Sequence, residues 1–409
     1  MSTTPGRTYD LIVFGATGFV GQILCRYLND RYGSDGDLNW AIAGRNPDKL
    51  ASVSGDLGLS VDHMVADTAD DNAVRSLAES TRVVVSTVGP YSIHGSPLVR
   101  AAVAAGTDYC DLAGETHWMQ AMIDAHQDSA TRTGARVVHS CGFDSIPSDL
   151  GVFFTQQRSL ELLGEQCNQI SMRVKAMRGG PSGGTIASML NVIDDVSENP
   201  ELRQVLANPY ALAPMGMRTG VRQLNVTLPM RDEASRRWVA PFVMAGVNSR
   251  IVHRSHALQG RPWGDDFLYD EATLTGSGPV GAAKAGVMAG GLGAALAAIS
   301  VKPIRKLLGE RVLPQAGEGP SPEAQKSGFF DFRFYGTTAS GSAITTRVTG
   351  DRDPGYGSTA KMLGEAAVAL LHLDPADKPG GFWTPSTAFG MPLVDRLIEH
   401  AGLTFSIVN

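Results

Sequence analysis

The segment YDLIVFGATGFVG, residues 9–21, decides the fold of this chain of 409 residues. Its first six residues form a short apolar run that is typical of a buried β-strand. Glycines follow at positions 15, 18 and 21, and a helical pattern of apolar residues then continues to about Gly33. A strand, a glycine-rich turn and a helix in this order predict a binding site for the pyrophosphate of a dinucleotide.

Each glycine of this turn has its own predicted purpose. Gly15 permits the sharp turn, Gly18 lets the main chain approach the phosphates, and Gly21 lets the helix pack closely against the strand. The N-terminus of the helix adds partial positive charge. The residues of the turn expected to contact the cofactor are Gly15, Thr17, Gly18, Phe19, Val20 and Gly21.

Further strands and helices alternate after this unit. Apolar runs predict strands at 40–43, 61–66, 83–87, 109–112 and 136–140, with helical patterns between them. The run at 83–87 is almost entirely β-branched, as in a strand that is covered on both faces. The sequence therefore predicts an α/β fold whose N-terminal domain is a Rossmann-type, doubly wound parallel sheet.

The pattern changes after Pro147. A strand is predicted at 169–177, and Phe330, Phe332 and Phe334 alternate with polar residues in a run that pairs with 343–349 as a hairpin. We expect a dinucleotide-binding domain at 1–147 and an α+β substrate or dimerisation domain with an antiparallel sheet at 148–350. The remaining residues, 351–409, are expected to be mainly helical.

Residues 285–301 contain no charged side chain and are bracketed by Lys284 and Lys302. The run is short for a membrane span and consists mostly of alanine and glycine, so a span is not expected. A buried or interface helix with close backbone packing is the favoured interpretation. Contact with a membrane surface is the alternative.

Composition excludes several classes of function. The formal net charge of −6 leaves no basic surplus for a nucleic-acid partner. The four cysteines have no metal-type spacing, so we expect reduced thiols and no metal site. Residues 1–8 lack the apolar stretch of a signal peptide, which favours a cytoplasmic location.

The end of the second strand predicts which cofactor is bound. An NAD site places a carboxylate there for the ribose 2′-hydroxyl, but this strand ends in Ala43-Gly44-Arg45. Because a guanidinium can pair with a 2′-phosphate, we expect NADP (NADPH). The alternative is a surface arginine that tolerates either cofactor. Asp67, after the third strand, is a candidate neighbour of the adenine or an ordinary helix cap.

The loop after the fourth strand is expected to lie at the nicotinamide ring, with Thr87, Gly89 and Pro90 shaping the contact. A hydride transfer usually needs a matching proton, and Tyr91 and His94 are candidate donors. The alternative for both is a packing or capping role.

The loop after the sixth strand, residues 141–149, leads into the second domain. Its position places Asp144 and Ser145 as candidates for substrate orientation or proton transfer, with a loop cap as the alternative. Cys141 is not favoured as a nucleophile, because the sequence offers no base for it.

Several motifs together resemble the saccharopine dehydrogenase-like oxidoreductases, and within them the actinobacterial trans-acting enoyl reductases. They are the turn at 15–21 with Ala43-Gly44-Arg45, and the segments Val88-Gly89-Pro90-Tyr91, Asp111-Leu112-Ala113-Gly114-Glu115, 141–149 and 348–356. The resemblance covers most of the chain and is weakest between about 200 and 320.

The resemblance implies an NADP-linked reductase, with C-terminal helices that pack back on the first domain. It implies reduction of the C=C bond of a polyketide or long-chain acyl intermediate in lipid biosynthesis. The expected partners are an acyl thioester or lipid intermediate and a polyketide synthase, with no nucleic acid. We also expect a homodimer, and a cytoplasmic protein with peripheral membrane contact through 285–301.

Two alternatives remain open. A saccharopine-type enzyme would reduce an amino-acid-derived imine, and its pocket would present arginines to substrate carboxylates. The second domain offers candidates for this role: Arg173, Arg178, Arg250, Arg254 and Arg261. A protein of another class would bind the cofactor without catalysis and act as a scaffold at a lipid surface.

Overall fold

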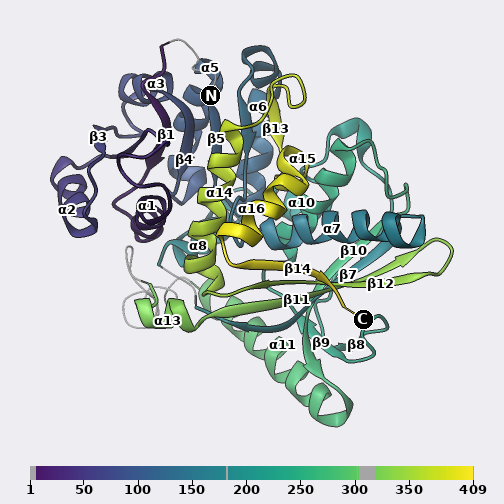
Figure 1. The fold of residues 1–409 in the computed structure, drawn as a ribbon. Coiled ribbons are helices and arrows are strands. Elements are labelled where there is room, and N and C mark those ends of the chain that lie inside the picture. The colour runs from purple at the N-terminus through teal and green to yellow at the C-terminus, as the bar shows by residue number, and fades with distance from the viewer. Residues whose placement is uncertain (1–5, 181–182, 302, 304–318, 409) are drawn as a thin grey trace. The chain divides into compact units, whose positions relative to one another are not determined.

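The computed structural model describes the chain except for residues 1–5, 181–182, 302, 304–318 and 409. The chain divides into two compact units (Figure 1). The first comprises residues 1–144 and 356–401, and the second comprises residues 145–355 and 402–409.

The first unit is built on a parallel sheet with the strand order β3-β2-β1-β4-β5-β6-β13. The strands are β1 (Tyr9–Phe14), β2 (Trp40–Gly44), β3 (Asp62–Val65), β4 (Thr81–Ser86), β5 (Asp108–Asp111), β6 (Arg136–Val138) and β13 (Gly381–Trp383). The predicted Rossmann-type fold is confirmed. The strand order reverses between β1 and β4, and ligands of such sheets bind at the carboxyl ends of the strands on either side of this point.

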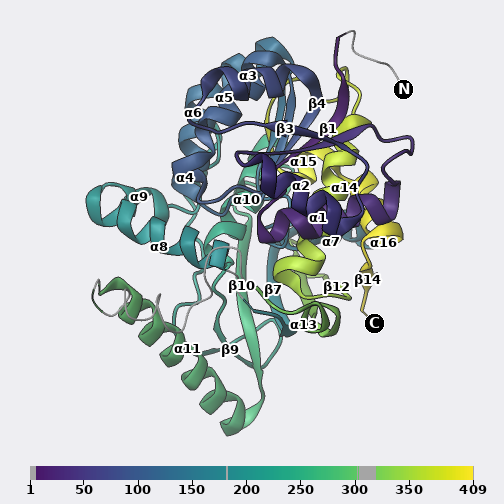
Figure 2. The same ribbon diagram turned by 90° about the vertical axis from the view of Figure 1, so that its left-hand side faces the viewer.

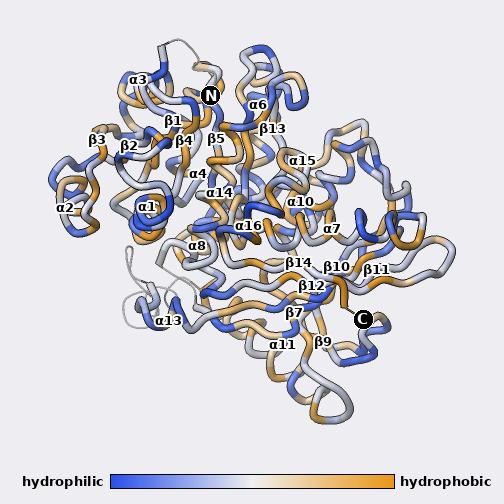
Figure 3. The backbone as a smooth tube through the Cα atoms, viewed as in Figure 1, coloured by the Kyte–Doolittle hydropathy of each residue, from blue (hydrophilic) through white to orange (hydrophobic). Residues whose placement is uncertain are grey.

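Helices connect these strands, and local sequence determines where they begin. They are α1 (Phe19–Tyr32), α2 (Pro47–Leu57), α3 (Asp71–Ser80), α4 (Tyr91–His94), α5 (Ser96–Ala105) and α6 (Thr116–Thr133). Asn46 caps α2 by accepting from Lys49 N–H at 2.9 Å, and Asp70 caps α3 in the same way. The apolar strand β4, whose valines are fully buried, lies near the middle of the sheet (Figure 3).

The C-terminal part of the chain returns to the first unit as α14 (Thr359–Leu371), α15 (Pro385–Phe389) and α16 (Met391–His400). The buried carboxylate of Glu365 on α14 accepts hydrogen bonds from Tyr27 at 2.6 Å and Tyr32 at 2.8 Å, both on α1. Arg396 on α16 pairs with its other oxygen at 2.6 Å. This cluster holds α14 against α1. The helix that follows the glycine turn is therefore stabilised by residues more than three hundred positions away in the sequence.

The second unit contains a mixed sheet with the order β14-β12-β11-β7-β10-β9-β8. Its strands are β7 (Cys167–Arg178), β8 (Met230–Arg231), β9 (Trp238–Pro241), β10 (Leu268–Gly276), β11 (Phe329–Thr338), β12 (Ala343–Gly350) and β14 (Leu403–Ile407). The predicted hairpin is the antiparallel pair β11–β12, and Phe330, Phe332 and Phe334 are buried. The sheet is not purely antiparallel, because β10 runs parallel to β7.

The helices of this unit are α7 (Ile146–Leu163), α8 (Gly183–Glu198), α9 (Leu202–Ala207), α10 (Ala245–Leu258), α11 (Gly278–Ser300) and α13 (Pro322–Ser327). The charge-free run at 285–301 forms most of α11, as predicted. Of the favoured interpretation, a buried or interface helix, burial is wrong for the single chain, and an interface role stays a prediction. Only Gly281, Ala285 and Ile299 of α11 are buried. Among the described residues, α11 is the one helix long and apolar enough to cross a membrane.

Candidate functional site

The glycine turn after β1 leaves no room for side chains where it folds back on itself. A Cβ at Gly15 would lie 2.5 Å from Val88 Cγ2 and 2.8 Å from Thr87 Oγ1. Gly15 also has a φ of +91°, which disfavours other residues. A Cβ at Gly21 would lie 2.1 Å from the carbonyl oxygen of Gly15. These two glycines let the turn, β4 and α1 approach each other closely.

Gly18 differs from Gly15 and Gly21, because a Cβ at Gly18 would meet only the Gly15 oxygen, at 3.3 Å. It is the N-cap of α1, has no side-chain cap and is followed by no acidic residue in the first turn. The N–H groups of that turn are therefore available to an anion. The turn fits the pyrophosphate of a dinucleotide, with Thr17, Phe19 and Val20 half-buried around it.

Arg45 lies directly after β2 and is exposed. Strand β2 pairs with β1, so Arg45 and the glycine turn follow neighbouring strand ends. The methyl group of Thr17 lies beside Gly44. No acidic side chain occupies the end of β2, and the next acid in the sequence is Asp48.

Asp67 follows β3 and forms a local turn. Its Oδ1 accepts from the N–H of Ala69 at 3.0 Å, while Asp70 is the residue that caps α3. The carboxylate thus stabilises its own loop, and its predicted contact with adenine stays a prediction.

The loop after β4 is tied to the glycine turn. Thr87 N–H donates to Phe14 O at 3.0 Å, and Thr87 Oγ1 donates to Gly15 O at 3.1 Å. The Gly89–Pro90 peptide bond is cis. The predicted cofactor residues Gly15 and Thr87 are therefore in direct contact with each other, and their contact with the nicotinamide ring stays a prediction.

Tyr91 is buried at the start of α4. Its hydroxyl donates to Ser86 O and accepts from Leu112 N–H, both at 3.1 Å. Burial, with the charge of Asp111, raises the pKa of this hydroxyl well above its usual value. These bonds favour the packing alternative over proton donation. His94, at the end of α4, is half-buried.

Glu115 also holds the loop after β4. The sequence did not indicate this role. The two carboxylate oxygens of Glu115 accept from the N–H groups of Tyr91 and Ser92, each at 2.8 Å. The side chain is 1% exposed. A buried carboxylate between two N–H groups is a strong, charge-assisted contact, and here it fixes the start of α4.

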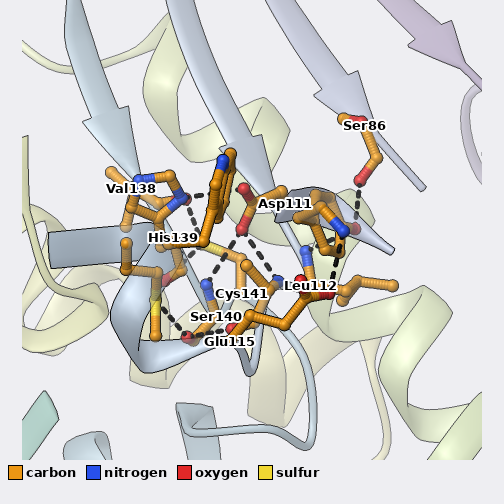
Figure 4. Close-up of polar contacts among 12 residues, drawn as sticks. Ser86, Asp111, Leu112, Glu115, Val138, His139, Ser140 and Cys141 are labelled. Atoms are coloured by element: carbon orange, nitrogen blue, oxygen red, sulfur yellow. Dashed lines mark hydrogen bonds and ion pairs between the residues drawn. The ribbon is translucent and has the colours of Figure 1, made fainter. Parts of the chain in front are cut away.

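Asp111, at the end of β5, organises the next loop (Figure 4). One oxygen accepts from Ala113 N–H at 3.0 Å and Ser140 N–H at 3.2 Å, and the other accepts from His139 Nδ1 at 2.8 Å. The His139 ring packs among Tyr109, Trp118 and Phe382. The Asp111–His139 pair is buried, so it supports the carboxyl edge of the sheet.

Asp144 is the last residue of the first unit and remains partly exposed. Burial, with a smaller contribution from the charge of Asp111, raises the pKa of its carboxyl group to about 7. This carboxyl group can therefore donate or accept a proton near neutral pH.

Ser145 belongs to the second unit, so the division between units falls between the two candidates. Its hydroxyl donates to Asn248 Oδ1 at 3.0 Å, and Asn248 donates to Glu271 at 2.9 Å. Ser145 is buried, so its contacts here are structural.

The arginines considered for substrate carboxylates are engaged within the second unit. Buried Arg173 pairs with Asp232 and Asp270, each at 2.6 Å. Arg250 and Arg254, also buried, donate to the main-chain oxygens of Leu206 and Leu212.

The other two arginines of this set lie at the surface. Arg261 pairs with Asp265 at 3.0 Å, and the guanidinium carbon of Arg178 lies 5.8 Å from the ring centre of Phe329. The described cysteines are all buried free thiols.

Comparisons with known proteins agree with this geometry. Residues 11–138 match the model of the saccharopine dehydrogenase NADP binding domain. A protein of Mycobacterium tuberculosis that carries the provisional name trans-acting enoyl reductase is 40% identical, over 97% of each chain. Proteins named trans-acting enoyl reductase from Mycobacterium ulcerans and Mycobacterium bovis are each 35% identical, over 96% of each chain.

Two solved structures share the fold at low sequence identity. Saccharopine dehydrogenase (L-Glu forming) from Saccharomyces cerevisiae has a TM-score of 0.55 at 12% identity, over 98% of this chain and 100% of that one. Homospermidine synthase from Legionella pneumophila, in complex with NAD, has a TM-score of 0.53 at 9% identity, over 98% and 91%.

Proposed function

Since the chain belongs to the trans-acting enoyl reductase family of saccharopine dehydrogenase-like oxidoreductases, we propose that it uses NADPH to reduce an enoyl thioester. Family membership confirms the resemblance inferred from the motifs. The protein is a nicotinamide-dinucleotide oxidoreductase. The observation that carries the proposal is the Gly15–Gly21 turn, which has the backbone approach and the uncapped helix start that a pyrophosphate needs.

Preference for NADPH over NADH is part of the proposal. Exposed Arg45 stands at the end of β2, where an NAD site would place a carboxylate. A guanidinium there can form paired hydrogen bonds with the 2′-phosphate. The family model is likewise that of an NADP-binding domain.

The bound nicotinamide would supply a hydride to the β-carbon of the α,β-unsaturated thioester. Gly18 and the start of α1 would bind the pyrophosphate, and Thr87–Pro90 would contact the ring. Glu115 fixes the start of α4, which directly follows Pro90. Transfer of the hydride breaks the C=C π bond and leaves an enolate, whose α-carbon takes up one proton.

Asp144 is the proposed source of this proton. Its carboxyl group is partly exposed and has a pKa of about 7, so much of it is protonated at neutral pH. After the transfer, the carboxylate would regain a proton from water. Tyr91 and Ser145 are less suitable, because their hydroxyl groups are buried in protein hydrogen bonds.

The proposed substrate is a polyketide or long-chain acyl thioester, delivered by a polyketide synthase that this protein serves in trans. The relatives are named trans-acting enoyl reductases, which fits an enzyme that acts on an intermediate held by another protein. We place this activity in the cytoplasm and expect a homodimer. Peripheral membrane contact through α11 belongs to the same expectation.

Reduction of an amino-acid-derived imine is the competing activity. It would need free arginines for substrate carboxylates, but Arg173, Arg250 and Arg254 are buried and bound to protein groups. Of the five candidates, this leaves Arg178 and Arg261 at the surface. The test is the rate of NADPH oxidation with a panel of enoyl thioesters and saccharopine-like imines. Turnover of the thioesters alone supports the proposal, and turnover of the imines alone contradicts it.

A further inference from the structure

Helix α11 (Gly278–Ser300) is attached to the second unit along only part of its length. Near its start, Gly281 and Ala285 are buried beside β9 and β10. At about 100° per residue, Met288 points in nearly the same direction as these two residues, yet it is 44% exposed. The helix thus diverges from the strands, as Figure 2 shows.

The exposed apolar side chains of α11 lie on opposite sides of the helix. Val287 is 76% exposed and Leu296 is 42% exposed. Their separation by nine positions in the sequence places them about 180° apart around the helix axis. Val280, on the side of Val287, is also mostly exposed. The described part of the chain therefore leaves both of these sides of α11 exposed.

Charge near α11 is positive although the whole chain carries −6. Lys284 is the one charged residue of α11 and is exposed. The hairpin β8–β9, which adjoins the start of α11, exposes Arg231, Arg236 and Arg237, with Glu233 as its exposed acid. Cations beside an apolar helix complement a surface of anionic lipid headgroups.

A membrane span does not fit the topology. Strand β10 precedes α11 and β11 follows it, and both pair with β7 in one sheet. Both connections of α11 must therefore return to the same side of a membrane. A helix that lies in the headgroup and acyl boundary satisfies this requirement.

We propose that α11 is a lipid-binding helix that inserts along the surface of an anionic membrane, with Lys284 and the arginines of the β8–β9 hairpin at the headgroups. The inference rests on the exposure of α11 and is independent of the reaction proposed above.

The test is flotation of the full chain with vesicles of phosphatidylcholine, either alone or containing one part in about three of phosphatidylglycerol. We expect flotation with the anionic vesicles that weakens as salt is added. The double variant Val287→Glu/Leu296→Glu should reduce the bound fraction about tenfold, and Lys284→Glu should reduce it less. Leu162→Glu, at a 60% exposed position on α7, is the matched control and should float like the native chain.

Retained NADPH binding by the double variant, measured by fluorescence, will show that it is folded. Equal flotation of the native chain and the double variant would overturn the proposal, as would no flotation of the native chain. A native dimer that the double variant converts to monomer, without vesicle binding, would instead identify a second copy as the occupant of α11.

Discussion

The carboxylate of Glu115 accepts a hydrogen bond from the main-chain N–H of Tyr91 at 2.8 Å, and its second oxygen accepts from the next N–H at the same distance. This contact joins the loop after β5 to the loop after β4. Because Gly89 and Pro90 immediately precede Tyr91, Glu115 fixes the chain directly after the expected nicotinamide contact.

Replacement of Glu115 by glutamine should therefore weaken both the fold and cofactor binding. One oxygen becomes an NH₂ group that cannot accept a hydrogen bond, so a buried N–H loses its partner. The free energy of unfolding should fall by about 1.5–3 kcal/mol, as for other buried hydrogen bonds to charged groups. Denaturant titration measures this loss, and NADPH titration should show weaker binding. Glu79→Gln, on the exposed surface of α3, should change neither quantity.

Gly18→Val should abolish cofactor binding without unfolding the protein. A Cβ at position 18 would meet only Gly15 O, at 3.3 Å, a tight contact that a small shift of the turn relieves, but the side chain would enter the space of the pyrophosphate. Gly21→Ala is the contrasting variant, because its methyl group would lie 2.1 Å from Gly15 O and should lower the melting temperature. NADPH binding by a folded Gly18→Val variant would refute the placement of the pyrophosphate.

Arg45→Ala should remove most of the preference for NADPH over NADH. Loss of a charge-assisted contact of about 1.5–3 kcal/mol corresponds to roughly a ten- to hundredfold change in the ratio of dissociation constants. Affinity for NADH should stay nearly constant, which serves as the internal control. Fluorescence titration with both cofactors measures the ratio, and equal affinities in the native protein would rule out this role for Arg45.

Asp144 predicts a specific pH dependence. Because the acid form would donate the proton and its pKa is about 7, kcat/KM should be level below pH 7 and fall above it. Asp144→Asn should lower kcat and remove this alkaline limb. If kcat/KM of the variant still falls above pH 7, another group is responsible for this pH dependence.

The same group also affects stability. Its pKa is higher in the folded state than the usual 3.8, so folding favours the protonated form. The contribution of Asp144 to the free energy of unfolding is therefore lost as pH rises from about 4 through about 7. Asp144→Asn should raise the melting temperature more at pH 8 than at pH 5.

The first unit was predictable because β1, β2 and β4 are local apolar runs, each followed by a turn or loop. β13 was missed, since Gly381–Trp383 is too short to show a pattern and its partner β6 is distant in sequence. Glu115 and Asp111 were seen only as parts of a motif. Their partners are mainly main-chain groups of separate loops, which leave no signature in the sequence.

The surroundings of α11 could not be predicted for a different reason. A run without charges predicts a helix that avoids water, but it does not determine whether protein, a second copy or lipid provides the cover. Val287 and Leu296 are exposed in the folded chain, so the described residues of the same chain do not cover them.

The most direct measurement of the proposed reaction uses NADPH that carries deuterium at the transferable position of the nicotinamide ring. The protein is incubated with an α,β-unsaturated thioester, and the deuterium in the product is located by NMR. We predict one deuterium on the β-carbon and one solvent-derived proton on the α-carbon. Deuterium at any other carbon, or transfer only to a saccharopine-like imine, would contradict enoyl reduction.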